Sequence, residues 1–133
     1  MDYFEALPEN CPIDKAKDEA VSAVWRVVSQ DPPGAEDFLS LAALGVACSE
    51  IGDPCRHASC SMFKSKIKAL NIARRLPKAR VPAPHLSLCE IKIGHGKSYT
   101  NKKKHVDFWP YAGFDPAQIV LSTQSVDLAD QMP

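Results

Sequence analysis

The residues that could do chemistry are concentrated in Gly94–Tyr111 (GHGKSYTNKKKHVDFWPY), where two glycines, two histidines, four lysines and four aromatic residues fall within eighteen positions. His105 and Asp107 are two residues apart, so they share a face if the segment is a strand. A carboxylate beside a histidine fixes the tautomer and holds a proton-transfer group ready near neutral pH. We expect His95 and His105 to face each other across a hairpin, and both are candidates for proton transfer together with Asp107.

Two further catalytic candidates lie on other predicted elements. Arg26 stands in the apolar run VWRVV and Ser61 begins a short apolar stretch. A guanidinium that pointed inward would need a carboxylate or a ligand as partner, so we expect Arg26 on a solvated face. With His95 and His105, these residues are the set that a small enzyme acting on a nucleotide or phosphorylated substrate would use. A transferase that grips a dinucleotide between split strands is one such case, although no suitable glutamate closes the motif.

The glycines and lysines of the same segment indicate an anion site. Gly94-His95-Gly96-Lys97-Ser98 resembles a phosphate loop only superficially, because a P-loop needs G-x4-G-K-[ST] between a strand and a helix. A flexible turn is the simpler interpretation. The functional interpretation is an anion site formed by Lys97 and by the three consecutive lysines Lys102, Lys103 and Lys104.

The aromatic residues that follow the lysines allow two interpretations. Trp109 and Tyr111 could form a stacking platform like those of single-stranded nucleic-acid binders, in which lysines follow the phosphates. A Phe-Trp-Pro-Tyr run at the end of a strand is more typical of a core plug, because each ring can bury about 150–250 Å². The exposure of Trp109 distinguishes the two, and we favour the core plug.

The five cysteines raise the question of a metal site. Cys48, Cys55 and Cys60 surround His57, but their C-x6-C and C-x4-C gaps differ from the close pairs of structural zinc sites. We therefore predict no metal and no cofactor, and leave a zinc-stabilised interaction domain as the third hypothesis. The first twelve residues do not resemble a secretory signal, so we expect reduced thiols and a cytoplasmic location.

The charges are balanced overall but unevenly distributed. Sixteen Lys and Arg oppose sixteen Asp and Glu, so the whole molecule would not be drawn strongly to nucleic acid. Between Lys64 and Lys104, however, twelve basic residues are opposed only by Glu90. One face could therefore be basic, although charge runs are more often simply solvated surface.

The element pattern predicts one domain over residues 1–133, with an N-terminal arm over 1–12 and a frayed tail over 127–133. The fold class is α+β, a small and mostly antiparallel sheet of four or five strands with two or three helices. We predict strands over 23–29, 61–63, 86–93, 105–109 and 118–123. We predict helices that begin after Asp14, over 35–44, and over 66–76 with a Ser65 cap.

These features favour a small binding or regulatory module that presents a basic, aromatic hairpin to an anionic ligand, protein or nucleic acid. That hypothesis leads because nothing in the sequence demands catalysis, and the small enzyme is the alternative. No membrane partner is expected, since no apolar run approaches the roughly 18–20 residues of a membrane span. The sequence does not predict an oligomeric state.

Overall fold

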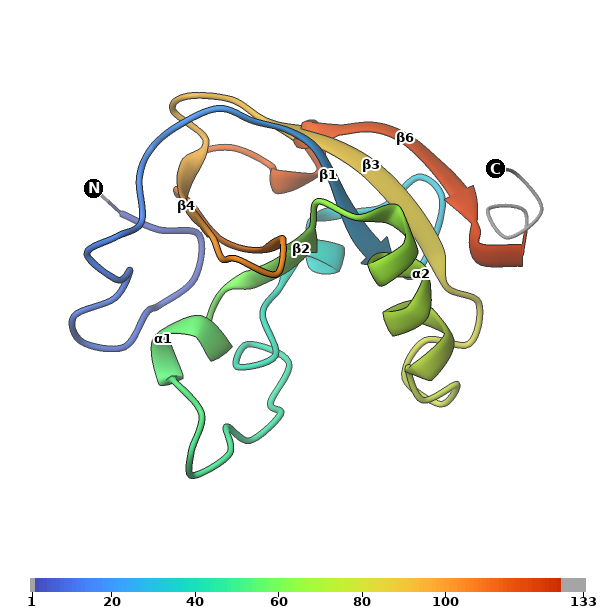
Figure 1. Ribbon diagram of the computed structural model, residues 1–133, viewed down its shortest axis with the longest axis horizontal. Coiled ribbons are helices and arrows are strands. Elements are labelled where there is room, and N and C mark those ends of the chain that lie inside the picture. Colours follow the sequence, from blue (N-terminus) through green and yellow to red (C-terminus); the bar gives the residue numbers. More distant parts are fainter. Residues whose placement is uncertain (1, 128–133) are drawn as a thin grey trace.

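The computed structural model describes residues 2–127, which fold around one six-stranded antiparallel sheet in the order β4-β5-β2-β1-β3-β6 (Figure 1). The α+β class is confirmed, with one strand more than predicted. The strands are β1 (Val21–Val28), β2 (Cys60–Phe63), β3 (His85–Ile91), β4 (Gly96–Thr100), β5 (His105–Pro110) and β6 (Val120–Ser125). The helices are α1 (Pro54–His57), α2 (Lys66–Arg75) and the 3-10 helices η1 (Ala35–Phe38) and η2 (Pro116–Ile119).

The sheet consists of two three-stranded halves that meet at β1 and β2. Those two strands pair at one position, Trp25 with Phe63, whereas β1 and β3 pair at six positions. One half is β4-β5-β2 and the other is β1-β3-β6. The junction is therefore poor in ladder hydrogen bonds compared with the rest of the sheet.

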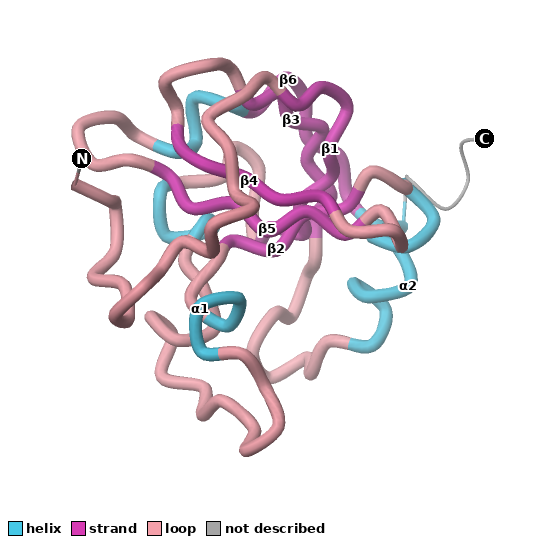
Figure 2. The backbone as a smooth tube through the Cα atoms, turned by 60° about the vertical axis from the view of Figure 1, so that its left-hand side comes forward, coloured by secondary structure: helices cyan, strands magenta, loops and turns pink. Residues whose placement is uncertain are grey.

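Alternation along β1 sends side chains to two separate cores, one on each face of the sheet. Val24 and Val28 belong to the larger core with Phe38 and Phe108, while Val27 packs in the core under α2 with Leu86. Both α helices lie on the same side of the strands, as the two views agree (Figure 2). The face that carries α2 also carries α1, which matters for the site described below.

The helix predicted over 66–76 is confirmed as α2. Ser65 caps it, with Oγ accepting from the backbone N–H of Lys68 at 3.3 Å, and Leu70 and Ala73 face the core. Ile67 is 70% exposed, so not every apolar residue of α2 faces the core.

The helix predicted over 35–44 is wrong beyond its first turn. Only η1 forms, because side chains offer the backbone other partners. The carboxylate of Asp37 accepts from the backbone N–H of Ser29 at 2.8 Å, and Ser40 donates its backbone N–H to Glu5 at 2.8 Å. Gly45 has φ +80°, a left-handed conformation that glycine adopts readily, and it ends the turn that follows η1.

No helix follows Asp14. Lys17 instead pairs with Ser98 through two backbone hydrogen bonds of 2.9 Å, so this segment lies extended along the edge strand β4. The predicted arm also contacts the sheet, with Phe4 donating its backbone N–H to the Pro110 carbonyl at 2.8 Å. The N-terminal segment therefore covers the edge that β4 would otherwise leave exposed.

Strand β4 forms where the sequence predicted a flexible turn. Its first residue, Gly96, approaches the neighbouring strand so closely that a Cβ there would lie 2.3 Å from the Trp109 carbonyl oxygen. The glycine thus permits strand packing rather than a flexible turn. Among residues 2–127 no helix is long and apolar enough to cross a membrane. Apart from Asp127, the predicted frayed tail lies outside the described residues.

Candidate functional site

The two histidines expected to face each other lie at opposite ends of the β4–β5 hairpin. Tyr111 donates its backbone N–H to the His95 carbonyl at one end, and Asn101 donates to the His105 carbonyl at the other. The ring of His95 stacks on Phe114 at 4.8 Å, and its Nδ1 accepts from the Lys92 backbone N–H. The expected pairing is wrong because the sequence reading missed β4, which separates the two histidines by a full strand.

Trp109 and Tyr111 are buried, as the core-plug interpretation predicted. Trp109 is 1% exposed and its indole Nε1 donates to the Cys55 carbonyl at 3.1 Å. The Tyr111 hydroxyl donates to Asp18 at 3.0 Å, and burial is the main cause that raises the pKa of Tyr111 to about 12. Neither ring is available to stack on a ligand at the surface.

Arg26 is half-buried and does not lie on a solvated face. Its side chain points to the same face as Val24 and Val28, where it donates to three backbone carbonyls. Nη1 binds the Ser61 carbonyl across the junction at 2.8 Å, and Nε and Nη2 bind the carbonyls of Asp37 and Leu39. The arginine therefore joins β1 to β2 and to the loop after η1.

Three of the catalytic candidates do converge, in an open-sided hollow of about 240 Å³ beside α1. Ser61 pairs with Asp107 across β2 and β5, and His105 lies two residues from Asp107 on the same face. We call this site the α1 hollow. Its other side comes from the loop before α1 and from α1 itself, through Cys48, Ser49, Gly52, Asp53, Arg56 and His57.

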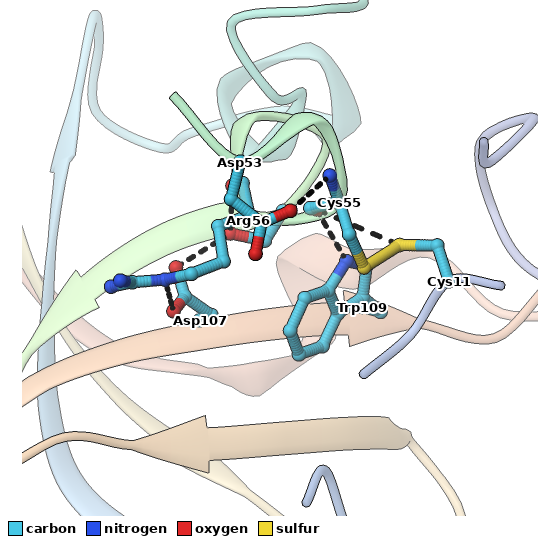
Figure 3. Close-up of a disulfide and its surroundings, with 7 residues drawn as sticks. Cys11, Asp53, Cys55, Arg56, Asp107 and Trp109 are labelled. Carbon is cyan, nitrogen blue, oxygen red and sulfur yellow. Dashed lines mark hydrogen bonds and ion pairs between the residues drawn. A yellow bond between two sulfur atoms is a disulfide. The ribbon is translucent and has the colours of Figure 1, made fainter. Parts of the chain in front are cut away.

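Asp107 is the buried centre of the α1 hollow, at 1% exposure. One carboxylate oxygen accepts from Arg56 Nε at 2.7 Å, and the other lies 2.9 Å from the hydroxyl of buried Ser59. The Arg56 side chain itself remains 41% exposed. The contact therefore fixes an arginine at the mouth of the hollow by means of a carboxylate at its base (Figure 3).

His105 sits at the edge of this network. Its Nδ1 is 3.6 Å from an Asp107 oxygen, too long for a hydrogen bond, and this buried nitrogen has no hydrogen-bond partner among residues 2–127. Desolvation lowers the pKa of His105 below 6.5, Asp107 opposes this, and the charge of Arg56 adds to it. Burial therefore favours the neutral form of the His105 imidazole more than in an exposed histidine.

Helix α1 is short, so its position depends on tethers outside it. Asp53 caps it by accepting from the Cys55 backbone N–H at 2.9 Å, and Pro54 occupies its first position. Cys55 forms a disulfide with Cys11 of the N-terminal arm. The backbone carbonyl of Cys55 also accepts a hydrogen bond from the indole of Trp109, so α1 is held against both the arm and β5 (Figure 3).

The expectation of reduced thiols is wrong for Cys11 and Cys55. Disulfides are typical of oxidising compartments, so the argument from thiols to a cytoplasmic location no longer holds. Of the zinc candidates, Cys48 and His57 line the α1 hollow, but Cys55 is in the disulfide and Cys60 is buried in the larger core, where desolvation raises the pKa of its thiol. Within residues 2–127 no three His, Cys, Asp or Glu side chains are grouped so that they could hold a metal ion.

Sequence reasoning missed Arg56, the residue that Asp107 holds. The available signal was the string Asp53-Pro54-Cys55-Arg56, in which an N-cap residue and a proline at the first position predict a helix start. The partner of Arg56 could not be found in this way, because Asp107 is 51 residues further along the chain.

The predicted lysines are divided between two places. Lys97 pairs with Trp109 in the middle of the hairpin, whereas the three consecutive lysines form its tip. Lys64, which follows β2, and Lys68 in the first turn of α2 lie beside this tip. Lys64 donates its backbone N–H to the Lys104 carbonyl, and Lys68 Nζ donates to the Lys103 carbonyl. We define the lysine patch as Lys64, Lys68, Lys102, Lys103 and Lys104, all of which are exposed.

The molecule thus presents two polar features on neighbouring strands, a positively charged patch and a hollow with an anchored arginine. The patch can attract anions through charge, and the hollow can accept hydrogen-bonding groups at fixed positions. Comparisons with protein-family models, with curated proteins and with solved structures find no match to this chain.

Proposed function

We propose that this protein is a binding module that holds a polyanionic partner through the lysine patch. One observation carries the proposal: five exposed lysines from two segments of the chain gather at the hairpin tip. Among residues 2–127 none of these lysines forms an ion pair with a carboxylate. Their charges are therefore free to meet an external anion rather than neutralised within the fold.

The patch is held in place by the backbone of the turn. Asn101 Oδ1 accepts from the backbone N–H groups of Lys103 and His105 at 2.9 and 3.0 Å. Lys104 has φ +68°, so the turn adopts a defined left-handed conformation at that residue. A fixed backbone lowers the entropy cost of binding, which supports a binding role for the tip rather than a mobile charged loop.

The chemistry of the patch supports recognition of charge rather than of sequence. Lysine ammonium groups act as point charges toward phosphate or sulfate, without the planar geometry of arginine. Trp109 and Tyr111, the aromatic residues of the predicted hairpin, are buried and leave no stacking surface there. The preferred partner is therefore a chain of closely spaced anionic groups, such as a nucleic-acid backbone, bound with little base preference.

The test compares two triple variants that change the net charge equally. In the first, glutamine replaces all three residues of Lys102–Lys104, and in the control it replaces the exposed Lys15, Lys78 and Lys92. Labelled single-stranded DNA, RNA and heparin are titrated at several salt concentrations. Each phosphate contact contributes about 0.7–0.9 to the slope of log affinity against log salt, so the tip variant should lose about 2–3 units of slope.

Thermal stability should hardly change in either variant, because exposed charges contribute little to folding. An equal loss of affinity in the control variant would mean that net charge, and not the patch, governs binding. The absence of any binding at low salt would remove the proposal altogether.

A further inference from the structure

We infer that the α1 hollow is a binding site for a tetrahedral oxyanion, the phosphate group of a small molecule or of a partner, and that Arg56 is the residue that grips it. The inference goes beyond polyanion binding, since neither the hollow nor Arg56 belongs to the lysine patch. Four features of the described residues carry it: the donors left on Arg56, the burial of Asp107, the other polar groups, and the size of the hollow.

Arg56 keeps most of its donors for a ligand. Only Nε is engaged in the structure, with Asp107, and the two terminal nitrogens have no partner among residues 2–127. Those nitrogens carry four N–H groups in a planar fork, the geometry that binds two oxygens of a phosphate at once. A guanidinium held by its Nε and open at its fork is oriented before the ligand arrives.

The burial of Asp107 supports the interpretation that its ion pair with Arg56 serves to position the arginine. An ion pair with one buried partner contributes little net stability, because desolvating the carboxylate offsets much of the attraction. The Ser59 hydroxyl lies 2.9 Å from the same carboxylate and 2.7 Å from the Arg56 carbonyl, so it can donate to either of these two groups. The arrangement is therefore better explained by the need to fix Arg56 than by the need to stabilise the fold.

The remaining groups fit a tetrahedral anion better than a planar carboxylate. Ser49, Ser61 and His105 also line the hollow, and their side chains carry hydroxyl and imidazole groups. A carboxylate would use the arginine fork alone, whereas a phosphate has further oxygens for these groups. At about 240 Å³ the hollow is smaller than the roughly 300–1,000 Å³ of sites for whole drug-sized ligands, so it fits one group.

The charged groups that line the hollow should make the binding of an anion depend on pH. The groups that face His105 are Asp107 and Arg56, whose charges offset each other, and Asp53 and His57 line the other side. The carboxylate of Asp53 opposes an anion, so binding should be modest when His105 is neutral. Protonation of His105 adds positive charge, and an anionic ligand should therefore bind more tightly at acidic pH.

The experiment is a titration of ¹⁵N-labelled protein followed by amide chemical shifts. Sulfate is the first probe, because it stays doubly charged between roughly pH 5.5 and pH 8, so a change of binding with pH in that range comes from the protein and not from the probe. We expect saturable shifts at residues 52–61 and 105–107 and several-fold tighter binding at the lower pH. Shifts that do not saturate, or that are confined to the lysine patch, would show an adventitious ion only and overturn the inference.

Variants then assign the shifts to Arg56. Arg56→Lys keeps the charge but loses the fork, and it should weaken sulfate binding by about tenfold or more. Arg80→Lys, at an exposed position, is the matched control and should leave binding unchanged. The triple Lys102–Lys104 variant should also retain the hollow's shifts, which separates this inference from the proposed function. Equal binding by Arg56→Lys and the unaltered protein would refute it.

Two further probes identify the source of the phosphate. Inorganic phosphate and phosphoserine are compared at one pH on the unaltered protein. If the natural ligand is the free anion, inorganic phosphate should bind at least as tightly. If it is a phosphate ester, phosphoserine should bind more tightly. Either ranking supports the oxyanion site, and failure of both to bind counts against it.

Discussion

Removal of the disulfide between Cys11 and Cys55 should lower the stability of the fold substantially. The bond joins residues 44 apart, and the chain-entropy relation for a loop of that length gives about 4 kcal/mol at 25 °C. The double variant Cys11→Ser, Cys55→Ser is preferred to either single change, because a single change leaves a new free thiol. We expect the free energy of unfolding to fall by about 4 kcal/mol, or by no less than about 2 kcal/mol if strain offsets the entropy.

Urea denaturation followed by tryptophan fluorescence measures this difference. Trp109 is hydrogen-bonded to the Cys55 carbonyl, so its environment changes when the fold around the disulfide opens. The control is reductant: it should lower the stability of the unaltered protein toward that of the double variant and leave the double variant unchanged. The free thiols Cys60 and Cys89 are buried and should take no part in the native state.

Two outcomes would refute the reasoning. A loss below about 1 kcal/mol would mean that the arm and α1 are held together by other contacts and that the loop entropy is not released. A loss in the double variant that reductant fails to reproduce would point to the serine side chains and not to the bond. A survey of the free thiols by alkylation before unfolding checks that the bond was formed at the start.

Two further predictions concern buried side chains. Trp109→Ala should lower the free energy of unfolding by about 3–5 kcal/mol in urea denaturation. The reason is that the indole is 1% exposed and hydrogen-bonded to the Cys55 carbonyl. A loss below about 1.5 kcal/mol would contradict its role as a core plug. Because the pKa of His105 is lowered in the folded state, the unfolded chain takes up that proton first, and stability should fall as pH drops below about 6.5. His105→Gln should remove that part of the decline when the urea midpoint is compared between pH 8 and pH 5, and identical pH profiles would be the contrary result.

The sequence predicted the elements whose signals are local. The β-branched run around Trp25 predicted β1 to within two residues, and Ser65 with Pro77 predicted both ends of α2. The short strand at Ser61 was also identified correctly. In these segments the hydrophobic period, the cap and the stop signal agree, so tertiary contacts had nothing to override.

The features that depend on distant residues could not be predicted. The segment after Phe38 leaves helical geometry because Glu5, far along the chain, takes hydrogen bonds from Ser40. Strand β4 lacks an apolar alternation, since Gly96 replaces a side chain by close backbone contact. Of five cysteines, no spacing rule selects the pair that bonds.

The candidate site divides in the same way. Ser61, His105 and Asp107 were identified from residue type and from the two-residue period of a strand, and the structure places them in one hollow. Arg56 was missed because its role comes from a contact with Asp107, 51 residues away. Arg26 was misread because its partners are backbone carbonyls, which leave no trace in a sequence.

The junction between β1 and β2 gives this protein an uncommon mutational profile. A sheet is ordinarily tolerant of substitution where its strands meet, because the ladder is made by backbone groups that every residue except proline carries. Here one residue pair joins the two halves in the ladder, and the guanidinium of Arg26 adds one hydrogen bond across the junction, to the Ser61 carbonyl. Part of the cohesion between the two halves thus depends on a side chain, so a substitution of Arg26 can weaken a contact that elsewhere in the sheet is made by backbone groups alone.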